Sequence, residues 1–214
     1  MRAASFVPVI GEISPYAVEG VPGLAEAVDF WTGGRPAGEW FREMEDSWGT
    51  SGFVLRRGEE VQGFLVYGPP ERFPRVGEYA VGPLADHGAM LACVAGDART
   101  GRRLLVRMLR DLRHRGVGSV EAVASDRERE YHVGTAFMLD CGWRPVRRTP
   151  PGLGRYTLVR TELSSAVEVG DIARSLVGKV KLPSLKRKVP APGALASPAE
   201  QHAAPLRAPL SARR

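Results

Sequence analysis

The sequence predicts a mixed α+β domain, with one central sheet and helices on both of its faces. Residues 53–67 have the pattern of an antiparallel hairpin, in which two apolar segments flank a turn at Gly58. Residues 90–124 follow the order strand, helix, strand, and the right-handed crossover of such a unit makes its two strands parallel. The 214 residues leave room for one well-cored domain and an appendage, since a domain takes roughly 100–200 residues.

Composition excludes several classes of protein. Hydrophobic residues make up 43% of the chain and charged residues 25%, which is typical of soluble globular proteins and not of disordered, collagen-like or coiled-coil chains. No apolar run approaches the roughly 18–20 residues that span a bilayer, and the apolar stretch at residues 6–10 is too short for an export signal. Cys93 and Cys141 both lie in apolar segments, where a reduced thiol behaves as a small hydrophobe. We therefore expect a cytoplasmic protein with no membrane partner.

The positive charge of the chain is concentrated at its end. Residues 179–214 contain eight Lys or Arg against one acid, Glu200, a net charge of +7, whereas the first 178 residues carry −1. The same stretch has six prolines, eight alanines and no aromatic residue, so it cannot bury enough apolar surface to offset its ordering entropy. We predict a folded domain over residues 1–178 and a disordered, basic, Pro/Ala-rich tail over residues 179–214. The tail is either a solvated segment or a weak, salt-sensitive site for nucleic acid and anionic surfaces.

Two helices precede the hairpin. Residues 23–31 have apolar positions at helical spacing and are followed by the helix-ending stretch 33–36. A second helix begins near Glu39, with Trp40, Phe41, Met44 and Trp48 on one face. After the hairpin, residues 69–86 are rich in Pro and Gly, and we expect either a loop or an irregular edge strand around residues 76–81.

The centre of the chain carries the strongest periodic signals. Residues 90–95 form a continuous apolar run, typical of a strand covered on both faces. Residues 101–116 form the clearest helix, which ends at Gly116. Its apolar stripe consists of Leu104, Leu105, Met108, Leu109 and Leu112. A strand at 119–124, a helix at 133–141, strands at 143–146 and 156–163 and an amphipathic helix at 168–177 complete the domain.

The junction between the apolar strand and the long helix is the best candidate for binding chemistry. A strand that ends in a short loop before a helix directs free backbone N–H groups into that loop, and these groups favour a phosphate. Arg99, Arg102 and Arg103 add positive charge at the same place, beside Thr100 and Gly101. The alternative interpretation is that these arginines are merely exposed at a helix start.

The order of elements, together with the helix at residues 101–117 and the Phe-x-x-x-x-Gly-aromatic ending Phe137 to Trp143, resembles the GNAT superfamily of acyl-CoA N-acyltransferases. More narrowly, the ending Arg160-Thr161-Glu162-Leu163 with a further amphipathic helix is similar to a bacterial subgroup of that family. The resemblance covers residues 53–177 well and the first helices loosely.

This resemblance implies a mostly antiparallel, mixed sheet that splays open between its two parallel strands. The pantetheine arm of acetyl-CoA, the co-substrate, would then pair with the backbone of Cys93 and Val94. The pyrophosphate would be held by the set Arg99, Thr100, Gly101, Arg102 and Arg103. A primary amine would enter from the opposite side, near the first two helices, and attack the thioester directly in a ternary complex. The expected activity is N-acetyltransferase.

The sequence departs from the family pattern at two places. The family's phosphate loop has Arg or Gln, two residues, Gly, one residue, then Gly or Ala; here Gly96, Arg99 and Gly101 hold these positions, and the loop is about three residues short. Met138 stands where many relatives carry a tyrosine that protonates the leaving thiolate. A catalytically silent protein of the same fold, which binds acyl-CoA or a partner without turnover, is therefore the alternative function.

Replacements for the missing proton-transfer groups are drawn from nearby polar residues. Tyr131 is the candidate acid, with Tyr156 as an alternative, and Glu78 is the candidate base. Asp86, His87 and Glu121 are further options for the base. We expect no metal site, because the histidines are too scattered and have too few cysteine partners. The sequence leaves the acceptor and the oligomeric state open, a homodimer being the commonest soluble assembly.

Overall fold

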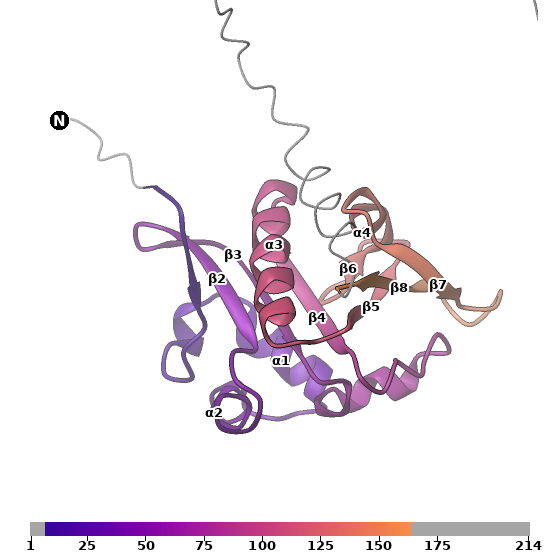
Figure 1. The fold of residues 1–214 in the computed structure, drawn as a ribbon, viewed down its shortest axis with the longest axis horizontal. Coiled ribbons are helices and arrows are strands. Elements are labelled where there is room, and N and C mark those ends of the chain that lie inside the picture. The colour runs from indigo at the N-terminus through magenta and orange to yellow at the C-terminus, as the bar shows by residue number, and fades with distance from the viewer. Residues whose placement is uncertain (1–6, 164–214) are drawn as a thin grey trace, which may run out of the picture. The chain divides into compact units, whose positions relative to one another are not determined.

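An eight-stranded sheet organises the protein in the computed structural model, which describes residues 7–163 (Figure 1). Its order is β1-β2-β3-β4-β5-β8-β7, with β6 paired to β5. The strands are β1 (Val9–Glu12), β2 (Gly52–Arg57), β3 (Glu60–Gly68), β4 (Ala89–Gly96), β5 (Ser119–Ser125), β6 (Val133–Gly134), β7 (Arg144–Arg148) and β8 (Tyr156–Glu162). The helices are α1 (Leu24–Thr32), α2 (Ala37–Ser47), α3 (Ala98–His114) and α4 (Thr135–Asp140), and the short 3-10 helices are η1 (Val18–Gly20), η2 (Pro70–Arg72) and η3 (Pro74–Glu78).

Each face of the sheet is covered by its own pair of helices. Alternation along β3 sends Phe64 and Val66 into one core and Leu65 and Tyr67 into the other. The first core is shared with α1 and α2, and we call that side the α1 face. The second is shared with α3 and α4, the α3 face, and Figure 1 shows α3 lying along β2, β3 and β4. The predicted mixed sheet with helices on both faces is confirmed.

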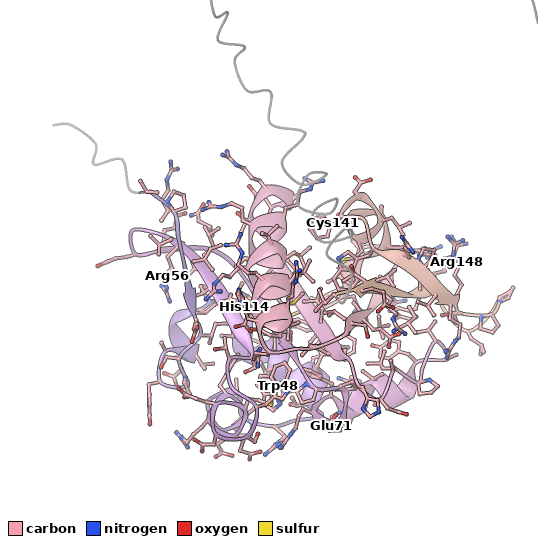
Figure 2. The ribbon with its side chains drawn as sticks, in the orientation of Figure 1. Trp48, Arg56, Glu71, His114, Cys141 and Arg148 are labelled. Atoms are coloured by element: carbon pink, nitrogen blue, oxygen red, sulfur yellow. The ribbon has the colours of Figure 1, made fainter. Side chains whose placement is uncertain are left out.

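The long helix α3 is held in place by a buried apolar stripe and by hydrogen bonds near its C-terminal end. Its predicted leucine and methionine stripe is fully buried on the α3 face. Near its C-terminal end Arg115 donates hydrogen bonds to the Trp48 carbonyl oxygen at 3.0 Å and the Thr50 carbonyl oxygen at 2.7 Å. Asp111 Oδ2 accepts from Arg115 at 2.5 Å and from the Tyr67 hydroxyl at 2.8 Å. Trp48 and the C-terminal end of α3 therefore lie together (Figure 2).

A bulge in β4 marks the place where the sheet divides. Val66 pairs with Cys93 and Tyr67 with Leu91, so Ala92 between them has no partner in β3. As a result Ala92 and Cys93, although adjacent, both face the α1 core. The parallel contact of β4 with β5 consists of two residue pairs at the start of both strands. Beyond them β5 pairs with β6 instead, so residues 91–96 have no described strand partner on their β5 side.

Most predicted elements are confirmed, and the differences have local causes. The hairpin, the apolar strand, the two N-terminal helices and the two closing strands lie where the sequence placed them. Of the two alternatives for residues 76–81, the edge strand is wrong and the irregular segment is confirmed: η3 covers Pro74–Glu78, and no strand forms between it and β4. The helix predicted from residue 101 begins at Ala98, and residues 133–134 form β6 rather than helix. The predicted helix at 168–177 and the tail from 179 lie outside the described residues.

A close approach of β3 and β4 beside α3 gives a first testable prediction. A Cβ atom added at Gly63 would overlap the Ala95 carbonyl oxygen and come within 2.8 Å of Thr100 Cγ2. We expect Gly63→Ala to lower the free energy of unfolding by about 1–3 kcal/mol, the usual cost of overpacking. Gly11→Ala is the matched control, because no atom lies within 4 Å of its added Cβ. Denaturant unfolding of both variants measures the effect, and equal stabilities would contradict it.

Candidate functional site

The candidate site is the gap where the ends of β4 and β5 separate. Cys93 and Val94 lie in the part of β4 that has left β5, so alternate N–H and C=O groups of this stretch point into the gap. The Cys93 side chain is buried on the α1 face, and burial raises the pKa of its thiol to about 12. The thiol is therefore neutral at pH 7, and the contribution of Cys93 is its backbone.

The turn that follows β4 is a single residue, Asp97. Strand β4 ends at Gly96 and α3 begins at Ala98. The Asp97 side chain caps the helix, with Oδ1 accepting a hydrogen bond from the Thr100 backbone N–H at 2.6 Å. This bond is the main reason that the pKa of Asp97 is lowered. A carboxylate thus takes the position at the helix N-terminus that an anionic ligand would use.

Thr100 and Gly101, predicted to line a phosphate loop, lie inside the first turn of α3. A Cβ atom at Gly101 would come within 2.9 Å of Phe137 Cζ and 3.2 Å of Val94 Cγ1. The absence of a side chain at Gly101 therefore lets α3 pack closely on β4 and α4. Its N–H donates to the Asp97 carbonyl oxygen at 2.8 Å. The side chain of Thr100 is buried as well, so these residues offer little beyond their backbone.

The three predicted arginines point in different directions. Arg99 is exposed in the first turn of α3. Arg102 lies toward α4, with its guanidinium 5.8 Å from the Phe137 ring centroid and 4.0 Å from the Asp140 carboxylate. Arg103 turns toward the N-terminal segment and donates to the Pro8 carbonyl oxygen at 3.2 Å. The start of α3 therefore presents Arg99 and Arg102 beside the gap, whereas Arg103 is engaged elsewhere.

The predicted acid, Tyr131, and the predicted base, Glu78, both lie on the α1 face, and each is bonded to a different partner. Tyr131 has a φ of 61° and is held by its carbonyl oxygen, which accepts from Trp31 Nε1 at 2.9 Å. Partial desolvation, then the carboxylates nearby, raise the pKa of Tyr131, which keeps its phenol protonated. The Glu78 side chain is 67% exposed and pairs with Arg75 Nε at 3.3 Å.

A surface hollow of about 490 Å³ lies beside Tyr131. Its walls come from α1, the turn before α2, and η3, and include both acidic and basic side chains. The lining residues are Ala25, Glu26, Asp29, Phe30, Arg35, Pro36, Ala37, Arg75 and Tyr131. This is the side from which the resemblance leads us to expect an amine acceptor, and the carboxylates of Glu26 and Asp29 suit a positively charged amine.

Sequence reasoning missed a pair of polar side chains close to Tyr131. The Tyr79 hydroxyl lies 2.7 Å from His132 Nε2, and His132 Nδ1 lies 2.8 Å from the Glu130 carbonyl oxygen. Their rings belong to one aromatic cluster, made of Phe30, Trp31, Tyr79, Tyr131, His132 and Tyr156. From the sequence, His132 is only one of four scattered histidines, and nothing near it in the chain indicates its contact with Tyr79. Within residues 7–163, no group of three or more His, Cys, Asp or Glu side chains could hold a metal ion.

The other residues considered for proton transfer lie either in the core or in an exposed loop. Glu121 is buried, accepts from the Ala85 backbone N–H at 2.7 Å and lies 3.7 Å from Arg160, so its carboxylate ties the loop before β4 to the sheet. Met138 is fully buried among the apolar side chains of the α3-face core, so this position offers no group for proton transfer. Asp86 and His87 are exposed in the loop before β4.

Comparison with known proteins identifies the fold. The sequence matches no protein-family model and no curated protein. Among solved structures, yncA of Salmonella typhimurium, named as an acetyltransferase and determined with its cofactor acetyl-CoA, has a TM-score of 0.53 at 16% identity, over 74% of this chain and 96% of that one. An N-acetyltransferase of Staphylococcus aureus Mu50 has a TM-score of 0.51 at 12% identity, over 74% and 99%. The chain has the fold of the GNAT N-acetyltransferases.

Among the described helices, none combines the length and the apolar character needed to cross a membrane.

The Asp97 cap makes stability depend on pH in a defined direction. Because the pKa of Asp97 is lowered in the folded state, its stabilising effect is present above the unfolded pKa of about 3.9 and is lost as the pH falls through the folded pKa. We expect wild type to be more stable than Asp97→Asn at pH 7, since Asn caps without the charge, and the difference to vanish in acid. Unfolding curves from pH 7 to pH 2 measure it, with Asp86→Asn controlling for net charge. A difference that stays constant with pH would contradict the cap.

Proposed function

We propose that the protein is an acyl-CoA-dependent N-acyltransferase that transfers acetyl from acetyl-CoA to a primary amine. The observation that carries the proposal is the gap between β4 and β5, with unpaired β4 backbone on one side and the start of α3 directly beyond it. The fold shared with yncA, which was determined with acetyl-CoA, supports this choice of co-substrate.

In this proposal the backbone of β4 holds the acyl donor. The peptide groups of Cys93 and Val94 would pair with the pantetheine arm, and a β4 N–H would polarise the thioester carbonyl. The diphosphate would lie at the start of α3, near Arg99 and Arg102 and the backbone of Thr100 and Gly101. The side chain of Arg103 would contribute only through its charge, because it is bonded to the Pro8 carbonyl oxygen.

The chemistry needs alignment and two proton transfers. A neutral amine entering from the α1 face would attack the thioester carbon; the C–N bond forms, the C–S bond breaks, nitrogen loses a proton and sulfur gains one. Tyr131 is the proposed acid for the thiolate, because its phenol is protonated at pH 7 and it lines the hollow on the acceptor side. Glu78 is the base that the sequence suggests, although its ion pair with Arg75 and its exposure favour a surface role.

Asp97 supports a second candidate function, a catalytically silent protein of the same fold. Its carboxylate already bonds the Thr100 N–H, and a negative charge at this position repels a diphosphate. In that case the gap between β4 and β5 would bind no acyl-CoA, or would bind it without turnover.

Calorimetric titration of acetyl-CoA into the purified full chain tests the main proposal. We expect micromolar binding, weakened roughly tenfold by Arg99→Glu, because reversing a charge near a diphosphate costs on the order of 1 kcal/mol or more. Arg110→Glu is the matched control, an exposed arginine of the same helix about three turns away. The absence of binding by a folded wild-type protein would overturn the enzyme proposal. Gly101→Asp would be a poor test, because its Cβ collides with Phe137.

Asp97→Asn separates the two candidate functions. The substitution keeps a side-chain acceptor for the Thr100 N–H and removes the negative charge, so acetyl-CoA should bind several-fold and up to about tenfold more tightly if the diphosphate lies at this turn. The same titration measures the change. An affinity that is unaltered in Asp97→Asn and in Arg99→Glu alike would place the ligand elsewhere.

A further inference from the structure

We propose that Tyr79 and His132 form the proton-accepting pair of this site, which takes the proton from the attacking amine. The inference rests on the proposed N-acyltransferase function and deepens it, since neither Glu78 nor any residue of α4 supplies a base in the gap. It is carried by the direct contact of the two side chains and by their place in the fold.

The pair lies at the end of β5 that has separated from β4. His132 immediately precedes β6, which pairs with the last residues of β5. Tyr156 opens β8 opposite Ser125, the last residue of β5, and its ring lies 5.3 Å from His132 and 4.9 Å from Tyr79. Tyr79 and Tyr156 pack against the same core as Cys93 of β4. The pair is therefore on the α1 face, beside the end of β5 that has separated from β4.

The neighbours of His132 determine which of its nitrogens carries the proton. A carbonyl oxygen can only accept, so Nδ1, 2.8 Å from the Glu130 carbonyl oxygen, is the N–H donor. In the neutral ring Nε2 is then a bare acceptor, and the Tyr79 hydroxyl 2.7 Å away donates to it. The hydroxyl oxygen of Tyr79 keeps lone pairs for a second partner. The arrangement is that of a phenol able to pass its proton inward while accepting another.

The surroundings keep both groups in the state that this transfer requires. Desolvation lowers the pKa of His132, and the positive charges of Arg129 and Arg75 act in the same direction, against the hydrogen bond to Glu130. Burial raises the pKa of Tyr79 to about 12. At pH 7 the imidazole is neutral and the phenol protonated. The titratable or charged groups that act on the pair are Glu130 and Arg129 of the loop after β5, Tyr156 of β8, and Arg75 and Glu78 of η3. The neighbouring Tyr131 faces Glu130 as well as Asp29 and Glu26 of α1.

The proposed step is balanced in protons and electrons. As the amine nitrogen bonds to the thioester carbon, its proton moves to the Tyr79 oxygen while the Tyr79 proton moves to His132 Nε2. Collapse of the tetrahedral intermediate breaks the C–S bond, and the thiolate takes a proton from Tyr131, which regains one from water. The His132 imidazolium then releases its extra proton to water. No oxidant, reductant or further reactant is needed.

The first experiment uses the wild-type chain alone. Proton NMR across pH 4–9 follows the His132 ring, with His132→Gln to assign its signal. We expect a pKa below the ordinary value of about 6.5 and, in 15N spectra at pH 7, the neutral tautomer protonated at Nδ1. A His132 ring that is charged at pH 7, or protonated at Nε2, would overturn the pair.

The second experiment measures acetylation of three probe amines with acetyl-CoA: 2-phenylethylamine, spermidine and a short peptide with a free N-terminus. We expect Tyr79→Phe and His132→Gln to lower kcat by about a hundredfold, within the usual range for general base catalysis, and to leave the acetyl-CoA dissociation constant unchanged. Tyr16→Phe, an exposed tyrosine far along the chain from the cluster, is the control and should retain full kcat.

The pH profile separates a base from a merely structural pair. Both the amine and His132 must be neutral, so in wild type the slope of log kcat/KM against pH should fall from about 2 to about 1 as the pH rises through the pKa of His132. In His132→Gln the slope should be about 1 throughout. The proposal is overturned if Glu78→Gln, and not His132→Gln, removes this change of slope, or if kcat survives Tyr79→Phe.

The outcomes also distinguish this inference from the function on which it rests. If acetyl-CoA does not bind, the proposed function fails and the pair loses its role with it. If acetyl-CoA binds and an amine is acetylated, but the two variants keep wild-type kcat, only the pair is overturned. If acetyl-CoA binds and none of the three amines is acetylated, the pair is not a base for primary amines.

Discussion

The short parallel contact between β4 and β5 is the constraint on which the rest of the site depends. Two residue pairs join the strands at their start, and the bulge at Ala92 then turns β4 away from its former plane. Because the ladder ends there, the following β4 backbone keeps its hydrogen-bonding groups free. A continuous ladder would satisfy those groups internally and close the gap between β4 and β5.

The α3 face shows a competition between internal capping and ligand binding. The first turn of α3 has free N–H groups whether or not a ligand is present, and Asp97 satisfies one of them from within the chain. The cap stabilises the helix start, and the same charge opposes an anion. Arg99 and Arg102 act in the other direction. In the proposed site, a balance of neighbouring charges would therefore set the affinity for a diphosphate, in contrast to a glycine-rich loop, where the backbone alone wraps the phosphate.

Local patterns predicted the fold better than the site. The hairpin, β4 and the stripe of α3 follow from periods of two and 3.6 residues, which depend only on neighbours in sequence. The start of α3 was missed although Asp97 is a residue type that caps helices, because the family loop was expected there. The pair of Tyr79 and His132 could not be predicted. These residues are 53 positions apart, and only the packing of η3 against the loop after β5 brings them together.

In the proposed reaction, burial of Met138 leaves the α1 face as the side for proton transfer. Its side chain fills the core between α4 and the sheet, and the hydroxyl that α4 does offer, Thr135, donates to Asp126 at 2.7 Å. On the α3 face the gap is therefore bordered by apolar atoms and by the charges at the start of α3. On the α1 face, Tyr79, Tyr131 and His132 lie beside the end of β5. In the proposed reaction, acid and base chemistry therefore belongs to the same side as the acceptor, so a substrate that fills this side would also determine whether its own proton can leave.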